Sequence, residues 1–196
     1  MTEIAAKPHM PPAAVARLEK AFATATCYLE YGSGGSTVLA NELQVPTTVS
    51  VESDKEWLQK LKSQISSTPE KERVFIHADI GPTGAWGNPV DDTHWRAWHH
   101  YPLAGWKECG SRALSPDLVL IDGRFRAACF YATLIFARTG SIILFDDYGD
   151  RPFYHEVERS VRPSAMHDRM AEFVVPSIED KTPLWLAFAD AVPDKR

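Results

Sequence analysis

The chain has 196 residues, a length that suits one domain. Its composition, with 44% hydrophobic and 24% charged residues, is that of an ordinary globular protein. Lys and Arg number 21 against 26 Asp and Glu, and this net charge of −5, without a basic stripe, argues against nucleic acid as a partner. No apolar run is long enough to span a membrane, and the start lacks an apolar signal-peptide core. We therefore expect a single cytoplasmic domain over residues 1–196.

Helices and strands are predicted to alternate along most of the chain. A helix is expected over residues 11–25, because two prolines precede apolar residues at helical spacing. Apolar or β-branched runs predict strands at 26–30, 47–51, 73–78, 117–121 and 141–145. Helical patterns predict helices at 36–43, 55–65, 124–138 and 155–161. Two further β-prone runs, at 172–175 and 184–189, predict a closing hairpin.

The alternation predicts the fold class. The strands at 117–121 and 141–145 are almost wholly apolar, which is typical of parallel strands buried on both faces. Strand and helix alternate from residue 26 to about 160, so we expect an α/β fold with right-handed crossovers. It would be a doubly wound, mostly parallel, seven-stranded sheet with helices on both faces and a C-terminal antiparallel hairpin. Ligands of such sheets bind beyond the carboxyl ends of the strands.

A glycine-rich turn follows the first predicted strand. Gly32 and Gly34 allow the backbone to approach a ligand closely, and the next helix begins with free N–H donors. A dinucleotide fingerprint would have a third glycine where this chain has Thr37. A nucleotide-dependent oxidoreductase of Rossmann type is therefore the less favoured interpretation of this turn.

Carboxylates recur where the five strands end. Each alone is more often a helix N-cap, but together they favour a cationic or hydroxyl-rich ligand. Glu52 stands where a carboxylate can accept hydrogen bonds from both hydroxyls of a ribose, and Asp79 can accept one from an adenine amino group. The residues at the strand ends are Glu30, Glu52, Asp79, Asp122 and the pair Asp146-Asp147.

This pattern resembles the class I S-adenosylmethionine-dependent methyltransferases over about residues 26–190. The resemblance implies a Rossmann-like fold and S-adenosylmethionine as cofactor. It implies that Glu30 helps to hold the cofactor's amino group, Glu52 its ribose and Asp79 its adenine. Ser36 replaces a third glycine of many members and can bond the cofactor carboxylate. The predicted cofactor-binding residues are Glu30, Gly32, Ser33, Gly34, Ser36, Thr37, Glu52, Ser53, Asp79, Ile80 and Asp122.

The residues after the fourth and fifth strands are similar to the small-molecule O-methyltransferase branch of this family. In that branch an Asp after strand four and an Asp-Asn pair after strand five bind a divalent metal. Here the Asn is replaced by Asp147, and Arg124 and Arg126 would compete with a cation. We expect no metal, with Mg²⁺ on Asp122, Asp146 and Asp147 as the minor alternative. Otherwise Asp122 pairs with Arg124 or orients substrate, while the Asp pair caps the next segment.

Residues 80–112 interrupt the alternation and contain four of the six tryptophans. A loop of this length is usually functional, and its aromatic residues argue against disorder. We expect an irregular insertion that forms a lid over the acceptor, with a structural cover or an oligomer interface as equal alternatives. The predicted substrate-pocket residues are Trp86, Trp95, Trp98, Arg124, Asp146 and Asp147, and the candidate catalytic groups are Asp122, His100 and His155.

The sequence therefore predicts an enzyme that transfers a methyl group from S-adenosylmethionine to an oxygen or nitrogen of a small molecule. Ile121-Asp-Gly-Arg124 follows the fourth strand in place of the Asn/Asp-Pro-Pro-Tyr motif of base-flipping methyltransferases, which argues against a nucleic acid acceptor. We expect no membrane partner, and a homo-oligomer remains open. The alternative from another functional class is a non-catalytic module that binds S-adenosylmethionine.

Overall fold

The computed structural model describes residues 4, 7–65 and 71–196, which form one seven-stranded sheet with the order β3-β2-β1-β4-β5-β7-β6. The first five strands run parallel, and β7 pairs antiparallel with both β5 and β6. The predicted fold class is confirmed. The strands are β1 Cys27–Tyr31, β2 Thr47–Glu52, β3 Glu72–His77, β4 Leu118–Ile121, β5 Ile142–Phe145, β6 Ala165–His167 and β7 Met170–Val174.

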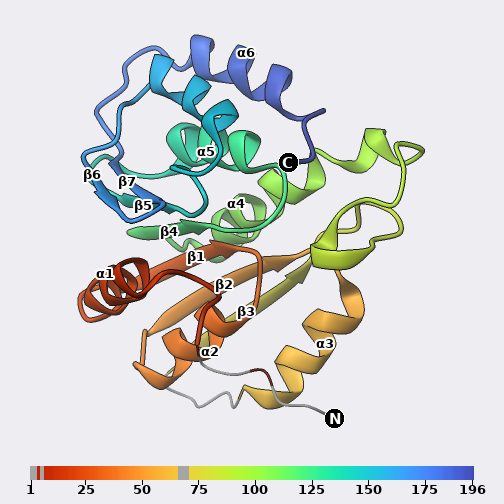
Figure 1. The fold of residues 1–196 in the computed structure, drawn as a ribbon, viewed down its shortest axis with the longest axis vertical. Coiled ribbons are helices and arrows are strands. Elements are labelled where there is room, and N and C mark those ends of the chain that lie inside the picture. The colour runs from red at the N-terminus through yellow and green to blue at the C-terminus, as the bar shows by residue number, and fades with distance from the viewer. Residues whose placement is uncertain (1–3, 5–6, 66–70) are drawn as a thin grey trace.

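Helices cover both faces of the sheet. One face carries α1 (Pro12–Phe22), α2 (Gly35–Glu42) and α3 (Lys55–Gln64). The other carries α4 (His100–Arg112), α5 (Arg126–Phe136) and α6 (Thr182–Ala191), so that α5 and α6 lie above the strands and α2 and α3 below them in Figure 1. None of the helices in the described ranges has the length and apolar character needed to cross a membrane.

The centre of the sheet explains the apolar strands of the sequence. Every residue of β1 and β4 is buried, because helices lie on both sides of these two strands. The chain winds outward from β1 through β2 to β3, and outward in the opposite direction from β4 to β5. The carboxyl ends of β1 and β4 therefore form the switch point at which ligands of doubly wound sheets bind.

The strand predicted at 184–189 is wrong. This segment belongs to α6, which places Leu184, Phe188 and Ala191 on one buried face against α5. A short apolar run without clear periodicity is compatible with either a strand or a buried helix, and packing on α5 selects the helix. The antiparallel C-terminal hairpin is present, but β6 and β7 form it.

The irregular insertion is shorter than predicted, because residues 100–112 form α4. Only the segment 78–99 is irregular, with two 3₁₀ turns at Ala85–Gly87 and Trp95–Ala97. Gly105 hides the helical pattern, yet a Cβ there would lie 2.6 Å from Leu29 Cδ1, so this glycine lets α4 approach β1. The helix predicted at 155–161 is the 3₁₀ helix Pro152–Arg159.

Candidate functional site

A cavity of about 910 Å³ lies at the carboxyl ends of the parallel strands. Its walls come from the turn after β1, the end of β2, the irregular segment 78–99, the turns after β4 and β5, and the N-terminal segment. A volume of this size accommodates a nucleoside-sized ligand together with a small second molecule. Of the predicted site residues it brings together Gly32, Ser33, Gly34, Ser36, Glu52, Ser53, Trp86, Asp122, Arg124, Asp146 and Asp147.

The floor of the cavity is a close contact between two glycines. Gly32 has a φ of +93°, and a Cβ on it would lie 2.9 Å from Gly123 Cα. A Cβ on Gly123 would in turn lie 2.8 Å from Gly32 N and closer still to the Tyr101 hydroxyl. Both positions therefore exclude a side chain, which brings the turns after β1 and β4 together and leaves backbone exposed to a ligand.

Glu52 presents a buried carboxylate to the cavity from the end of β2. Its Oε1 accepts hydrogen bonds from the N–H groups of Ser53 and Asp54, at 2.7 and 2.9 Å. Within the described residues its Oε2 accepts one hydrogen bond, from the N–H of Ser33 at 3.1 Å, which leaves acceptor capacity for a ligand hydroxyl. Burial raises the pKa of Glu52, although these hydrogen bonds oppose the shift. The side chain is rigidly held and suits recognition of a ribose.

Glu30 occupies a different place from the one predicted for it. It is fully buried, does not line the cavity, and accepts hydrogen bonds from the hydroxyls of Tyr28, Ser36, Thr37 and Ser50. Burial raises the pKa of its carboxyl, and the four hydroxyls favour the charged form. Through these contacts Glu30 holds the glycine-rich turn and the start of α2 in position, with its side chain outside the cavity lining.

Thr37 also acts within the turn. It is fully buried, outside the cavity lining, and its hydroxyl accepts the Gly34 N–H at 2.8 Å. The Thr37 hydroxyl thus caps the start of α2, at the position where a dinucleotide fingerprint would have a glycine.

Three carboxylates and three guanidinium groups form a network on the opposite side of the cavity. Arg126, which is 3% exposed, has its Nη2 3.2 Å from Asp122 Oδ1 and 3.1 Å from Asp147 Oδ2. Its Nη1 also donates to the backbone carbonyl of Asp146, at 2.7 Å. Asp122 therefore pairs with Arg126, and the alternative that it pairs with Arg124 is wrong. Arg126 ties the turn after β4 to the turn after β5.

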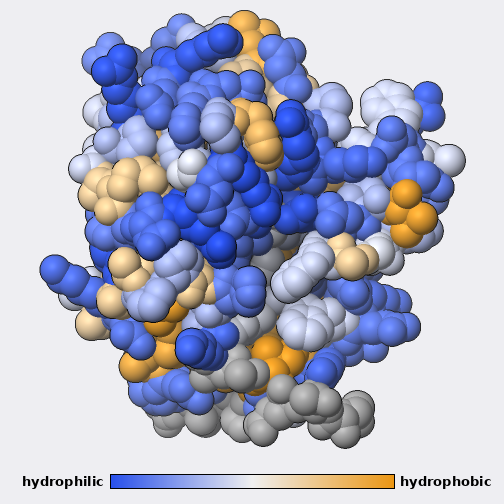
Figure 2. Space-filling view, in the orientation of Figure 1, coloured by the Kyte–Doolittle hydropathy of each residue, from blue (hydrophilic) through white to orange (hydrophobic). Residues whose placement is uncertain are grey.

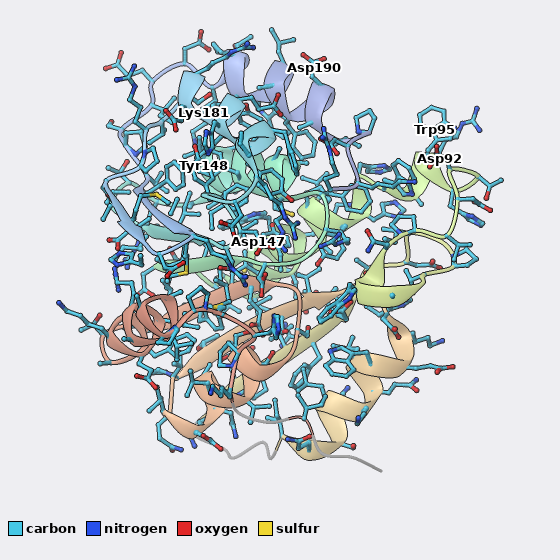
Figure 3. All side chains as sticks on the ribbon, in the orientation of Figure 1. Asp92, Trp95, Asp147, Tyr148, Lys181 and Asp190 are labelled. Carbon is cyan, nitrogen blue, oxygen red and sulfur yellow. The ribbon has the colours of Figure 1, made fainter. Side chains whose placement is uncertain are left out.

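The carboxylates of Asp146 and Asp147 also pair with two further arginines. Arg169 Nη2 lies 2.9 Å from Asp146 Oδ2, and Arg169 Nε lies 3.0 Å from Asp147 Oδ1. Arg151 Nη2 lies 2.9 Å from Asp147 Oδ2. Asp147 lies near the middle of the molecule in Figure 3, and the visible face around that place is strongly hydrophilic in Figure 2. The network thus joins three aspartates to three arginines by ion pairs along one wall.

Asp122 has an unusual acidity within this network. Burial and the neighbouring Asp146 and Asp147 carboxylates together raise its pKa to about 7, against the opposing charges of Arg126 and Arg169. A carboxyl with a pKa near neutrality can exchange a proton with a ligand at physiological pH. Asp122 lines the cavity and is the one predicted catalytic residue that the fold places there.

The donor set does not fit a divalent metal. One oxygen from each of Asp122, Asp146 and Asp147 lies within 4.8 Å of the others, a spacing that a cation can bridge. Each of these carboxylates is, however, already within 3.2 Å of a guanidinium group. A metal ion would have to displace Arg126 or Arg169 and would meet the repulsion of their charges. We derive no metal-dependent step.

Several predicted site residues lie away from the cavity. Asp79 is exposed and accepts the Gly81 N–H, and Ile80 is fully buried. Trp98 is buried against Phe125, whereas Trp95 is exposed at the outer end of the irregular segment, far from Asp147 in Figure 3. His100 and His155 are exposed outside the lining. Of the predicted lid, Trp86 alone contributes a tryptophan to the cavity.

Other residues reach the cavity without a signal in the sequence. Lys7, Pro8 and His9 cross the start of α2, where a Cβ on Gly35 would lie 2.7 Å from the Lys7 carbonyl oxygen. Arg169 Nη2 donates to the His9 carbonyl at 2.9 Å and holds this segment against the ion-pair network. Trp57 looks like an apolar residue of α3, but its Nε1 donates to the Ser33 carbonyl at 2.7 Å and its ring lines the cavity.

Solved structures share this fold. A methyltransferase-like protein from Silicibacter pomeroyi is 40% identical, with a TM-score of 0.85 over 96% of this chain and 97% of that chain. An O-methyltransferase from Bacillus cereus in complex with SAH is 16% identical, with a TM-score of 0.58 over 86% and 84%. The cofactor-bound Rv0187 from MTB is 15% identical, with a TM-score of 0.51 over 87% and 85%. No protein-family model and no curated protein matches.

Proposed function

Because the chain belongs to the family of S-adenosylmethionine-dependent methyltransferase-like proteins, we propose that it binds S-adenosylmethionine in the cavity and methylates an oxygen or nitrogen of a small molecule. The observation that carries this proposal is that one cavity joins the rigid Gly32–Gly123 floor and the Glu52 carboxylate to Asp122. A binding site for a nucleoside and a group able to accept a proton are thus continuous.

The residues of the first half of the cavity fit the cofactor. The free acceptor capacity of Glu52 Oε2 suits a ribose hydroxyl, and Trp57 offers an aromatic surface next to it. The turn after β1 exposes backbone that only glycine permits, so a ligand can lie directly against Gly32 and Gly34. When bound, S-adenosylmethionine would supply an electrophilic methyl group.

The residues of the second half suit an acceptor that must lose a proton. The Asp122 carboxyl has a pKa of about 7, so its ionised form can take a proton from a hydroxyl or ammonium group held beside it. Arg126 orients Asp122 and stabilises its charged form. The protein's main contribution is to position the acceptor in line for displacement, with Asp122 as the base. The acceptor is proposed to be a small molecule because a cavity of about 910 Å³ has room for a small second molecule beside the cofactor, and because the net charge of −5 does not favour nucleic acid.

The test combines binding with turnover. Calorimetry with SAH should detect binding to the wild-type protein, and E52A should bind it about 10- to 100-fold more weakly because a hydrogen bond to a charged group is lost. E56Q is the matched control, since Glu56 is exposed on α3 and outside the cavity. Wild-type affinity in E52A would remove the assignment of Glu52.

A screen of hydroxyl and amine compounds for release of SAH separates an enzyme from a non-catalytic binding module. Turnover that D122N lowers by roughly 100-fold or more, without a matching loss of SAH affinity, supports the proposal. Binding of SAH with no turnover of any compound would favour the non-catalytic module.

A further inference from the structure

One of the four arginines that line the cavity, Arg124, takes no part in the ion pairs between the described residues. Among the described residues, Arg126, Arg151 and Arg169 each pair with at least one aspartate, whereas Arg124 makes no ion pair. The Arg124 side chain lines the same cavity, and its one side-chain hydrogen bond in the described part of the chain joins Nη1 to Asn88 Oδ1 at 2.8 Å. Its Nε is buried without an acceptor. The protein itself therefore does not neutralise this charge.

The surroundings of Arg124 are unfavourable to a cation. Burial lowers the pKa of Arg124, and the positive charges of Arg126 and Arg151 lower it further. Across the whole lining there are six Lys and Arg side chains against five Asp and Glu, although the chain carries a net charge of −5. A partly buried cation without an ion-pair partner, beside two others, is costly unless a ligand brings a negative charge.

The backbone holds Arg124 in this place. Gly123 on one side admits no Cβ, and the Tyr101 hydroxyl accepts the Arg124 N–H at 3.4 Å. Phe125 on the other side has a φ of +54° and is fully buried against Trp98 and Tyr101. A bulky residue in the left-handed region persists only where packing over-determines it, and such strain clusters at ligand sites. The turn thus directs a cationic side chain at the cavity at a cost in stability.

From this arrangement we propose that the methyl acceptor carries a carboxylate or phosphate group and that Arg124 binds it. Asn88 holds Nη1, and a guanidinium group can bind a carboxylate or phosphate in a planar, bidentate manner. The anion would anchor the acceptor on the wall that also holds Asp122. This assignment names the substrate class and rests on the proposed function.

The experiment measures binding of three aromatic probes by calorimetry, with and without saturating SAH. Benzoate and phenyl phosphate carry the anion, and benzamide is their neutral counterpart. We expect at least one anion to bind about 10-fold or more tightly than benzamide, and R124Q to abolish this preference. Whichever of benzoate and phenyl phosphate binds more tightly shows whether Arg124 prefers a carboxylate or a phosphate group. Equal binding of all three probes, or an unchanged preference in R124Q, would overturn the proposal.

Two controls keep the result unambiguous. R96Q removes an exposed arginine from the irregular segment and should leave the preference unchanged. N88A retains the charge of Arg124 but removes the hydrogen bond that holds Nη1. It should therefore weaken anion binding several-fold and leave benzamide binding the same. This variant tests the proposal if R124Q is unstable. If the wild type binds SAH but shows no anion preference, the assignment of Arg124 is wrong while the proposed function still stands. If it binds no SAH, the proposed function fails, whereas the preference for an anion is still measured directly.

Discussion

Gly32 and Gly123 touch backbone to backbone, at a distance that admits no Cβ on either residue. The contact joins the turn after β1 to the turn after β4 and so defines the floor of the cavity at the switch point of the sheet. Because it depends on two glycines in different turns, it is sensitive to single-atom changes.

We expect G32A to lose both stability and SAH binding. The new Cβ would lie 2.9 Å from Gly123 Cα, and alanine does not readily adopt a φ of +93°. The free energy of unfolding should fall by about 2 kcal/mol or more, measured by urea denaturation. The matched control is G110A, on the exposed side of α4, where a Cβ meets nothing within 4 Å. It should gain about 0.5–1 kcal/mol from helix propensity.

Substitution of Gly35 tests the role of the N-terminal segment. In G35A the added Cβ would collide with the Lys7 carbonyl, 2.7 Å away, and displace Lys7, Pro8 and His9 from the cavity. Calorimetry should show SAH binding weakened by roughly 3- to 10-fold through lost contacts. Alanine favours the helix more than glycine does, so a weaker α2 cannot cause such a loss. Unchanged affinity would show that the segment does not contribute to binding.

The raised pKa of Asp122 predicts a specific dependence of stability on pH. Its value of about 7 in the folded protein exceeds that of the unfolded chain, so between about pH 4 and pH 7 the folded state binds more protons. The stability contributed by Asp122 must therefore fall as the pH rises through this window. Unfolding of wild type and D122N, compared at about pH 5 and pH 8, should show the wild type losing about 1 kcal/mol or more relative to the variant. A constant difference would contradict the raised pKa.

The ion pair between Arg169 and Asp146 predicts a large effect of R169Q. Asp146 is 1% exposed, so removing its partner leaves a buried, uncompensated charge. The expected loss is about 3–5 kcal/mol in the free energy of unfolding. R112Q is the matched control, because Arg112 pairs with Glu72 and Glu108 at the surface and should cost less than about 1 kcal/mol. Similar losses in the two variants would mean that the network is not truly buried.

Removal of divalent metal should change nothing. Guanidinium groups already pair with Asp122, Asp146 and Asp147, so dialysis against EDTA should leave the melting temperature and the SAH affinity within error of the untreated protein. Addition of millimolar Mg²⁺ should have no effect either. A fall in either quantity that Mg²⁺ restores would show that these carboxylates do hold a metal.

Local patterns were sufficient to predict the parallel part of the fold. The apolar runs of β4 and β5 have few alternatives, because strands covered on both faces require continuous apolar sequence. The C-terminal segment 184–189 was ambiguous, since its helix is selected by packing on α5. Likewise residues 100–112 were predicted to be irregular, although they form α4, in which Gly105 permits close packing on β1.

The amino-acid sequence alone determines which chemical groups stand at the ends of the strands, because strand periodicity and turn residues are local properties. It places Gly32, Glu52 and Asp122 at one edge of the sheet. The folded structure determines which charges meet. Glu30 is turned inward to four hydroxyls, and Arg169 pairs with a carboxylate 23 residues earlier. Arg124 has no ion-pair partner among the described residues. Such pairings depend on distances between turns that are far apart in the chain, and no local pattern encodes them.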